Sequence, residues 1–481
     1  MNFAIVRYLI GWMLGIESIF LLLPALTAVI YGEPELPAYL IAAAISLAGA
    51  ALLCHRKPKN TRFYAREGYV TVALCWLILA VIGALPFVLS REIPFFIDAL
   101  FETVSGFTTT GATILGDVEA LSHASMLWRC LTHWVGGMGV LVFMLIVLPL
   151  AGGQTIFLMR AESPGPSVSK MSPHMRDTAT ILYAIYFGLT VLQMILLLSG
   201  GMPLFDAICV SLGTAGTGGF GNWNDSIAHY NSAYLQNVIT VFMILFGINF
   251  SAYFLILTRK FRQAFRIEEI RVYLGVIFVF AGLIAFNVRP MFGSLRESFH
   301  HALFQVASII TTTGFSTVDF DQWPTFSRAL LVLLMFIGAC AGSTGGGIKC
   351  SRILLLGKSV KKELMCLIHP RLVRVNKMDG QRVPHEVMRS INVFVVAYAF
   401  IFILSLLIIS LNCEDLVTCF TSVATTLNNV GPGLSLCGPT CNFGFFPPLS
   451  KGVLIFDMLA GRLELFPMLL LFTPGTWQRN K

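Results

Sequence analysis

Long apolar runs separated by short polar segments dominate the chain. A helix needs about 20 predominantly apolar residues to cross the hydrocarbon core of a bilayer. The first run is too long for the apolar part of a signal peptide and lacks a cleavage motif, so we expect it to remain as a helix. The pattern predicts an all-α polytopic membrane protein with ten transmembrane helices. The runs lie at 3–31, 37–54, 68–90, 126–151, 178–199, 233–258, 270–288, 327–357, 390–411 and 450–473.

Composition and charge agree with this pattern. Apolar residues make up 56% of the 481 residues and charged residues only 12%, whereas a soluble domain has roughly a quarter charged residues. Lysine and arginine are concentrated in alternate connections, and such basic loops lie in the cytoplasm. We therefore expect both termini in the cytoplasm, and the net charge of +8 then needs no nucleic-acid partner. The basic connections are 54–66, 160–176, 259–271 and 358–389, and those without Lys or Arg are 31–37, 112–125 and 219–235.

Four shorter apolar stretches each end in a small, hydroxyl-rich segment with a glycine. They read IDALFETVSGFTTTGAT (97–113), FDAICVSLGTAGTGGFG (205–221), HHALFQVASIITTTGFS (300–316) and DLVTCFTSVATTLNNVGPG (415–433). A gapless comparison of the first three aligns Gly111, Gly219 and Gly314, and a one-residue shift adds Gly431. We expect four re-entrant pore helices in four pseudo-repeated helix–pore loop–helix units. The units span 67–160, 161–266, 267–360 and 361–481, after two N-terminal helices in 1–66.

These loops are candidates for an ion filter. Non-helical backbone at membrane depth survives only inside protein or beside a watery cavity, so the four loops should converge on one axis. There, carbonyls and threonine hydroxyls can replace the water shell of an ion, and the negative ends of the short helices favour a cation. The second loop reads GTGG, so its filter glycine is either Gly218 or Gly219. The candidate ion-binding residues are Thr109, Thr110, Gly111, Gly218, Gly219, Thr312, Thr313, Gly314, Asn429, Val430 and Gly431.

The stretch GACAGSTGGGIKC (338–350) interrupts the eighth apolar run. Each glycine costs a helix about 1 kcal/mol relative to alanine, and the spacing is not that of a phosphate-binding loop. We predict a broken helix whose intramembrane loop, 341–347, lies against the pore below the filter and acts as a gate. Its candidate gate residues are Gly342, Ser343, Thr344, Gly345, Gly346 and Gly347.

Arg462 is a charged residue about a dozen residues into the tenth run. A charge at such depth is costly and normally faces a cavity or a partner. We expect Arg462 to face the pore as part of the gate. Asp457 and Glu464 are candidate counter-charges.

The sequence offers little for other classes of function. No metal-ligand spacing, nucleophile–base constellation or ATP motif was found, so we expect neither an enzyme nor a cofactor. A secondary transporter, which couples K⁺ or Na⁺ to H⁺ or Na⁺ gradients, remains the alternative, although such proteins typically show two inverted repeats. Cys437 and Cys441, in an outward loop, are either a disulfide or two free thiols.

The motifs SGFTTTGAT, TAGTGGFGN, TTTGFST, NNVGPGLS and CAGSTGGGIK resemble those of the Trk/Ktr/HKT superfamily of potassium transporters, in particular the TrkH-type subunit of bacterial Trk potassium uptake. The similarity covers nearly the whole chain. It implies K⁺ as the transported ion, filter glycines at Gly111, Gly219, Gly314 and Gly431, and a flow-restricting Arg462 beneath them. It also implies a homodimer regulated by cytoplasmic TrkA-type nucleotide-binding subunits, for which the basic segment 358–389 is a suitable docking site. In related plant transporters a serine at the first filter position accompanies sodium preference, so Gly111 fits potassium.

Overall fold

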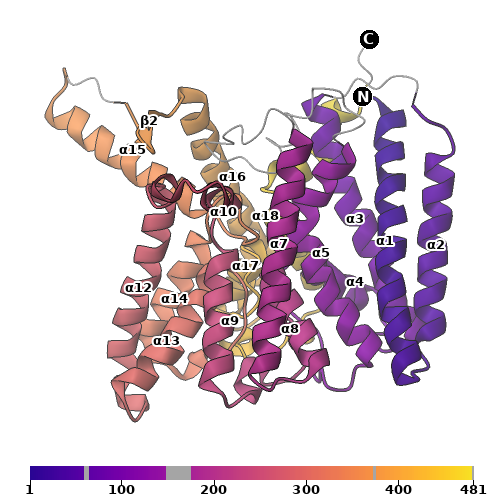
Figure 1. Ribbon diagram of the computed structural model, residues 1–481. Helices are drawn as coiled ribbons and strands as arrows, with labels where there is room; N and C mark the ends of the chain where they lie inside the picture. The colour runs from indigo at the N-terminus through magenta and orange to yellow at the C-terminus, as the bar shows by residue number, and fades with distance from the viewer. Residues whose placement is uncertain (59–63, 148–174, 372–374, 479–481) are drawn as a thin grey trace.

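The computed structural model describes residues 1–58, 64–147, 175–371 and 375–478. These residues form helices and one two-stranded antiparallel hairpin (Figure 1). The longer helices are α1 (Phe3–Tyr31), α2 (Leu36–Cys54), α3 (Ala65–Ser90), α5 (His123–Val147), α7 (Met175–Ser199), α12 (Glu268–Val288), α13 (Leu295–Ile310), α15 (Cys350–Ile368), α16 (His385–Ile409) and α18 (Pro448–Arg462). The shorter ones are α4 (Phe96–Phe107), α8 (Leu204–Gly216), α9 (Ala233–Phe246), α10 (Phe250–Leu257), α11 (Phe261–Ala264), α14 (Thr325–Ile337), α17 (Leu416–Leu427) and α19 (Phe466–Leu471). The strands are β1 (Lys377–Met378) and β2 (Gln381–Arg382).

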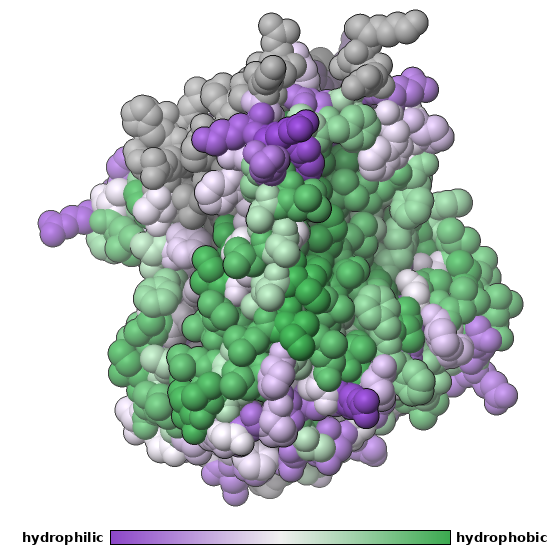
Figure 2. All heavy atoms as spheres, turned by 90° about the vertical axis from the view of Figure 1, so that its right-hand side faces the viewer, coloured by the Kyte–Doolittle hydropathy of each residue, from purple (hydrophilic) through white to green (hydrophobic). Residues whose placement is uncertain are grey.

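The outer surface of the helices is suited to a bilayer. Within the described residues, six helices are long and apolar enough to cross a membrane, or seven if the bent pair α9–α10 counts as one span. Figure 2 shows the face of the N-terminal helices, where a broad hydrophobic band separates two hydrophilic ends. The chain is therefore a multi-pass membrane protein. In Figure 1 both termini lie at the top, together with the exposed end of α15, whereas α8 and α13 lie in the lower half.

Most predicted apolar runs coincide with helices. Runs 3–31, 37–54, 68–90, 178–199, 270–288 and 390–411 correspond to α1, α2, α3, α7, α12 and α16. The run 126–151 corresponds to α5, and its last residues, 148–151, lie outside the described part of the chain, as does most of the basic connection 160–176. The run 327–357 is divided by a loop between α14 and α15, as we predicted.

Two runs that we expected to form unbroken helices are broken. The run 233–258 bends by 93° between α9 and α10, where the Asn249 side chain caps the second helix by accepting from Ser251 N. The run 450–473 divides at Glu464 and Leu465, which have φ of 57° and 68°. Pro467 in the first turn of α19 explains this break, because proline has no N–H to donate and its fixed φ suits the start of a helix.

Four short helices, α4, α8, α13 and α17, precede the four glycine segments. Their C-terminal ends are fully packed: Thr109, Thr217, Thr312 and Asn429 each have 0% exposed surface. The longer helices surround these ends, with α5 packed on both α4 and α8, α13 on α12 and α14, and α17 on α16 and α18. The fold thus holds four loops deep inside a helical protein. Cys437 is buried, Cys441 is exposed, and both are free thiols.

Candidate functional site

The four loops have the same backbone conformation although their sequences differ. A residue with left-handed φ follows the last residue of each short helix by one or two positions, and a glycine with positive φ follows two positions later. The residue between them donates its N–H to the carbonyl five positions earlier, at 2.8 to 2.9 Å. The left-handed residues are Thr109 (φ 55°), Thr217 (55°), Thr312 (58°) and Asn429 (56°), and the glycines are Gly111 (80°), Gly219 (78°), Gly314 (87°) and Gly431 (96°). The structure therefore brings four equivalent loops into the protein interior.

These loops touch one another in a closed ring. A Cβ built on Gly111 would lie 2.0 Å from the carbonyl oxygen of Gly218, and one on Gly219 would lie 2.0 Å from that of Thr313. A Cβ on Gly314 would lie 2.5 Å from the carbonyl oxygen of Val430, and one on Gly431 would lie 2.6 Å from that of Thr110. The contacts run from the first loop to the second, third and fourth, and back to the first. Because any side chain would collide with a neighbouring carbonyl, this geometry requires glycine at all four positions.

The structure also places the second loop in register. Gly219 shares the φ and the carbonyl contact of Gly111, whereas Gly218 corresponds to Thr110 and contributes a carbonyl to the ring. Thr217, which the sequence analysis did not select, occupies the position of Thr109. Its signal was present in the gapless alignment of TTTG with GTGG.

Several threonine hydroxyls hold the loops in place. Thr110 Oγ1 shares a hydrogen bond with Thr108 Oγ1 (2.8 Å) and accepts another from the Asn429 amide nitrogen (2.9 Å). Thr313 Oγ1 pairs with Thr311 Oγ1 at 2.7 Å. Thr110 and Thr313 hydroxyls are thus engaged with neighbouring protein groups, so the backbone carbonyls are the principal groups that this ring can offer to an ion.

Buried polar contacts connect the loops to the surrounding helices. His133 on α5 connects α4 to the second loop: its Nδ1 lies 2.8 Å from Gly106 O, and its Nε2 accepts from Phe220 N at 3.2 Å. Arg129 pairs with Glu102 at 2.8 Å, with both side chains almost fully buried, and its guanidinium lies 4.1 Å from the centre of the Phe220 ring. These contacts are typical of a rigid site, because breaking a buried pair leaves an uncompensated charge.

Two carboxylates in connections between the helices have a pKa below the ordinary value. Hydrogen bonds from Thr418 and Ser435 lower the pKa of Asp415, which caps α17, to about 2. The hydrogen bond from the Asn224 side chain lowers the pKa of Asp117 from its ordinary value. Both groups are therefore negatively charged at neutral pH.

The predicted gate loop lies directly against the ring. Gly346 N donates to Thr312 Oγ1 at 2.6 Å, and a Cβ on Gly346 would lie 2.5 Å from Asn428 O. Thr344 Oγ1 donates to Phe246 O at the end of α9, and Gly342 O accepts from Phe250 N at the start of α10. The loop thus fills the space between the ring and the bend of α9–α10.

Arg462 lies at this loop, but not in the setting that we expected. It is the last residue of α18, at the break before α19, and not in the middle of a continuous helix. Its guanidinium donates to Thr344 O (2.7 Å) in the loop and to Gly136 O (2.9 Å) on α5. The candidate counter-charges have other partners, since Glu464 pairs with Arg352 and Asp457 accepts from Ser405 Oγ. Arg462 therefore ties the loop to α5 through carbonyls.

Two functional candidates escaped the sequence analysis. Glu269, near the start of α12, accepts from Ala341 N (2.7 Å) and Ser351 N (3.0 Å), so one carboxylate holds both ends of the loop. Lys349, which follows the glycines, donates from Nζ to Gly345 O and has a positive φ of 78°. A lysine directly after GGGI was a usable signal, whereas nothing local to Glu269 indicated its distant partners.

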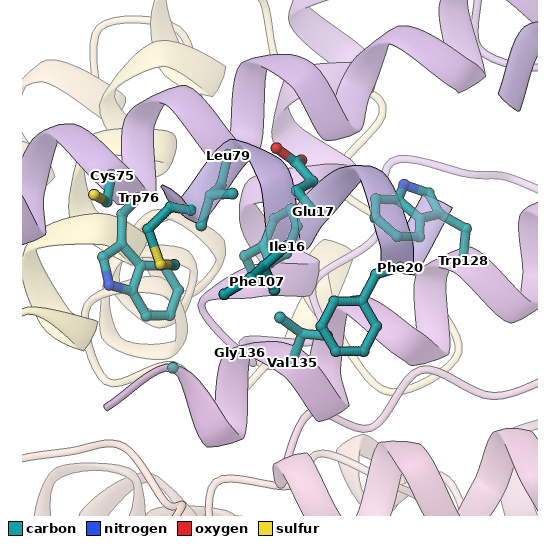
Figure 3. A pocket seen from close by; sticks show the side chains of 12 residues that line it. Ile16, Glu17, Phe20, Cys75, Trp76, Leu79, Phe107, Trp128, Val135 and Gly136 are labelled. Carbon is teal, nitrogen blue, oxygen red and sulfur yellow. The ribbon is translucent and has the colours of Figure 1, made fainter. Parts of the chain in front are cut away.

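A separate cavity lies behind the first loop, between α1, α3, α4 and α5 (Figure 3). Apolar side chains make up most of its lining and include the rings of Phe20, Trp76 and Phe107. Glu17 also lines it, is 3% exposed, and has two carboxylate oxygens without a hydrogen-bond partner among the described residues. Because the lining is otherwise apolar, this cavity is not an extension of the carbonyl ring.

Comparisons with known proteins agree with this geometry. Residues 37–478 match the TrkH family, described as cation transport protein. The chain is 38% identical to the Trk system potassium uptake protein TrkH of Escherichia coli (strain K12), over 99% of this chain and 100% of that protein. It is 33% identical to the protein TrkG of the same organism, over 98% of each. The crystal structure of the potassium transporter TrkH from Vibrio parahaemolyticus superimposes with a TM-score of 0.89 at 33% identity, over 99% of this chain and 100% of that one.

Proposed function

The chain belongs to the TrkH family of cation transport proteins, and on that premise we propose that it takes up potassium across the bacterial inner membrane. Its relatives are named as potassium uptake proteins, which confirms the family resemblance of the sequence motifs. The observation that carries the proposal is the closed ring of four equivalent loops, in which the glycine of each loop lies beside a carbonyl of the next. Such a ring binds and passes an ion without bond-making chemistry, as expected of a transporter and not of an enzyme.

In this proposal the ring is the selectivity filter. Carbonyl oxygens of Thr110, Gly218, Thr313 and Val430 replace water around a dehydrated K⁺. The short helices α4, α8, α13 and α17 direct their negative C-terminal ends at the same centre, which stabilises a cation there. Gly111, Gly219, Gly314 and Gly431 keep the four loops close enough for this coordination.

The loop from Gly342 to Gly347 and Arg462 together form the barrier on the cytoplasmic side of the filter. Their hydrogen bond makes them one unit, and the arginine adds a positive charge near the path of the cation. Repulsion between the two charges is stronger here than in water, because the surrounding protein has a lower dielectric constant. Opening requires the loop to leave the ring and Arg462 to leave Thr344.

The remaining parts of the proposal concern the orientation of the chain in the membrane and its partners. The basic segments and both termini lie in the cytoplasm, and ten spans with four pore helices form the four units around one axis. The chain acts as a homodimer, and a cytoplasmic nucleotide-binding subunit of TrkA type docks on the basic segment 358–389. Binding of this subunit affects the gate loop through α12. Glu268 forms an ion pair with Lys358 on α15, and its N–H donates to Asp379 in the turn of the hairpin. The adjacent Glu269 accepts hydrogen bonds from both ends of the gate loop.

Flux measurements in proteoliposomes at controlled voltage test the proposal. We expect K⁺ to move down its own electrochemical gradient, with exclusion of Na⁺. Net K⁺ movement driven by an imposed H⁺ or Na⁺ gradient, with no K⁺ driving force, would instead establish the coupled transporter that the sequence left as an alternative. Absence of any K⁺ flux from folded protein, with the regulator and its nucleotide present, would overturn the proposal.

A further inference from the structure

A second cavity, which is polar, lies far from the ring. It is at the top of the molecule in Figure 1, where α15, the β1–β2 hairpin and α16 meet. Its volume is about 280 Å³, which is large enough for a small polar headgroup. Three consecutive elements, α15, the hairpin and α16, build it, so it does not depend on one loop. The charged and amide side chains that line it include Lys362, Glu363, Asn376, Arg382, Arg389 and Asn392.

The charges of this cavity are suited to an anion. Lys362, Arg382 and Arg389 supply three cations, against one carboxylate from Glu363. The carboxylate lies 3.8 Å from Lys362, whereas Arg382 and Arg389 make no ion pair with the described residues. Asn376 and Asn392 add amide groups that can donate hydrogen bonds. Arginine and lysine around a polar cavity are well matched to a phosphate ester.

The cavity is built on fixed elements. Leu355, Met378, Val383 and Ile391 form a small hydrophobic cluster that joins α15, the hairpin and α16. Val383 N donates to Asn376 O at 2.9 Å, which closes the hairpin. The backbone segments that carry the basic residues are therefore packed together before any ligand arrives.

An apolar track leads away from the cavity along α16. One turn beyond Arg389 begins a row of exposed apolar side chains at helical spacing: Val393 (50% exposed), Val396 (70%) and Phe400 (69%). Since α16 is one of the helices long enough to cross a membrane, this row faces lipid. A ligand that filled the cavity with its anionic head could thus lay its tails along α16.

We propose that this cavity binds the headgroup of an anionic phospholipid of the cytoplasmic leaflet, such as phosphatidylglycerol. The location in the cytoplasmic leaflet rests on the orientation proposed above, and the lipid assignment rests on the basic cavity and the adjoining apolar row. Basic pockets at the cytoplasmic ends of transmembrane helices are typical sites for anionic headgroups. A bound lipid bridges α15 and α16, and so steadies the helix that leaves the gate loop.

Native mass spectrometry of the purified full-length protein, titrated with phosphatidylglycerol or zwitterionic phosphatidylethanolamine, tests this site. Each arginine removed should weaken phosphatidylglycerol binding by about fivefold, so R382Q/R389Q should lose about 25-fold. K361Q is the matched control, because Lys361 is a neighbouring cation on α15 that does not line the cavity. Glu363→Gln should tighten binding, a gain that misfolding cannot produce. Phosphatidylethanolamine should bind weakly to every form.

Three results would overturn the assignment. Equal losses in K361Q and R382Q/R389Q would mean general surface attraction, and unchanged affinity in both the double variant and Glu363→Gln would mean that the lipid binds elsewhere. Competition by glycerol phosphate at the same concentration as the lipid would assign the cavity to a soluble phosphate ester. The titration requires no ion flux, so its outcome is independent of whether the transport proposal holds.

Discussion

A serine at Gly111 should damage ion discrimination while leaving the fold intact. The new Cβ would start 2.0 Å from the carbonyl oxygen of Gly218, whereas close carbon–oxygen contacts in proteins are about 3.3 Å or longer. The two loops must therefore separate by about 1.3 Å. In addition, the φ of 80° becomes a strained conformation for a residue with a side chain, at a cost of about 1–2 kcal/mol.

This displacement acts on one of the four carbonyls that surround the ion. We expect the K⁺/Na⁺ permeability ratio to fall by about tenfold or more, which corresponds to about 1.4 kcal/mol of lost discrimination. The ratio is obtained from reversal potentials or from paired ⁸⁶Rb⁺ and ²²Na⁺ fluxes in proteoliposomes. Alanine at Gly219 should act similarly, because its Cβ also meets a carbonyl at 2.0 Å. Alanine at Gly314 or Gly431 should act less, because the corresponding contacts are 2.5 and 2.6 Å.

Gly116→Ser provides the matched control. Gly116 lies five residues after Gly111, and a Cβ there would meet nothing within 4 Å. The control should retain the wild-type ratio. Unchanged selectivity in all four ring variants, with equal amounts of folded protein, would refute the filter assignment, and so would equal damage from Gly116→Ser.

Three other sets of variants test the gate, the docking of the regulator and the cavity at Glu17. Arg462→Ala and deletion of Gly345–Gly347 should each raise K⁺ flux several-fold with selectivity retained, and their effects should not add because the groups share one barrier; slower flux in both would assign them to pore support. Charge reversal of Lys361 and Arg371, measured by pull-down with the nucleotide-binding subunit, should weaken docking while basal flux persists, and undiminished docking would leave these residues with a role in orientation alone. Glu17→Met should raise the stability in thermal unfolding by about 1–3 kcal/mol, since it removes an unpartnered buried polar group from an apolar cavity; a lower melting temperature would indicate that Glu17 has an unseen partner.

The sequence predicted local features well because they depend on local chemistry. Apolar length alone placed α1, α2, α3, α7, α12 and α16, and the glycines of 338–350 placed the break between α14 and α15. The spacing TTTG and GTGG put Gly111, Gly219 and Gly314 in register before any contact was known. The backbone of the four loops repeats because each needs the same two positive φ values.

Long-range contacts could not be predicted in this way. Nothing near Arg462 in the sequence indicates that it donates to Thr344 and Gly136, which lie 118 and 326 positions away. The prediction that Asp457 or Glu464 would neutralise it used sequence proximity, whereas their partners Ser405 and Arg352 lie on other helices. Proximity in a folded membrane protein is determined by helix packing, which a single sequence does not reveal.

Anomalous diffraction from crystals grown with Rb⁺ or Tl⁺ tests whether the ring of four loops binds the transported ion, because it locates the ion itself. We expect an anomalous peak on the axis of the ring, among the carbonyl oxygens of Thr110, Gly218, Thr313 and Val430. This peak should weaken in Gly111→Ser but not in Gly116→Ser. Peaks only at other places, with the four loops intact and no ion among these carbonyls, would contradict it.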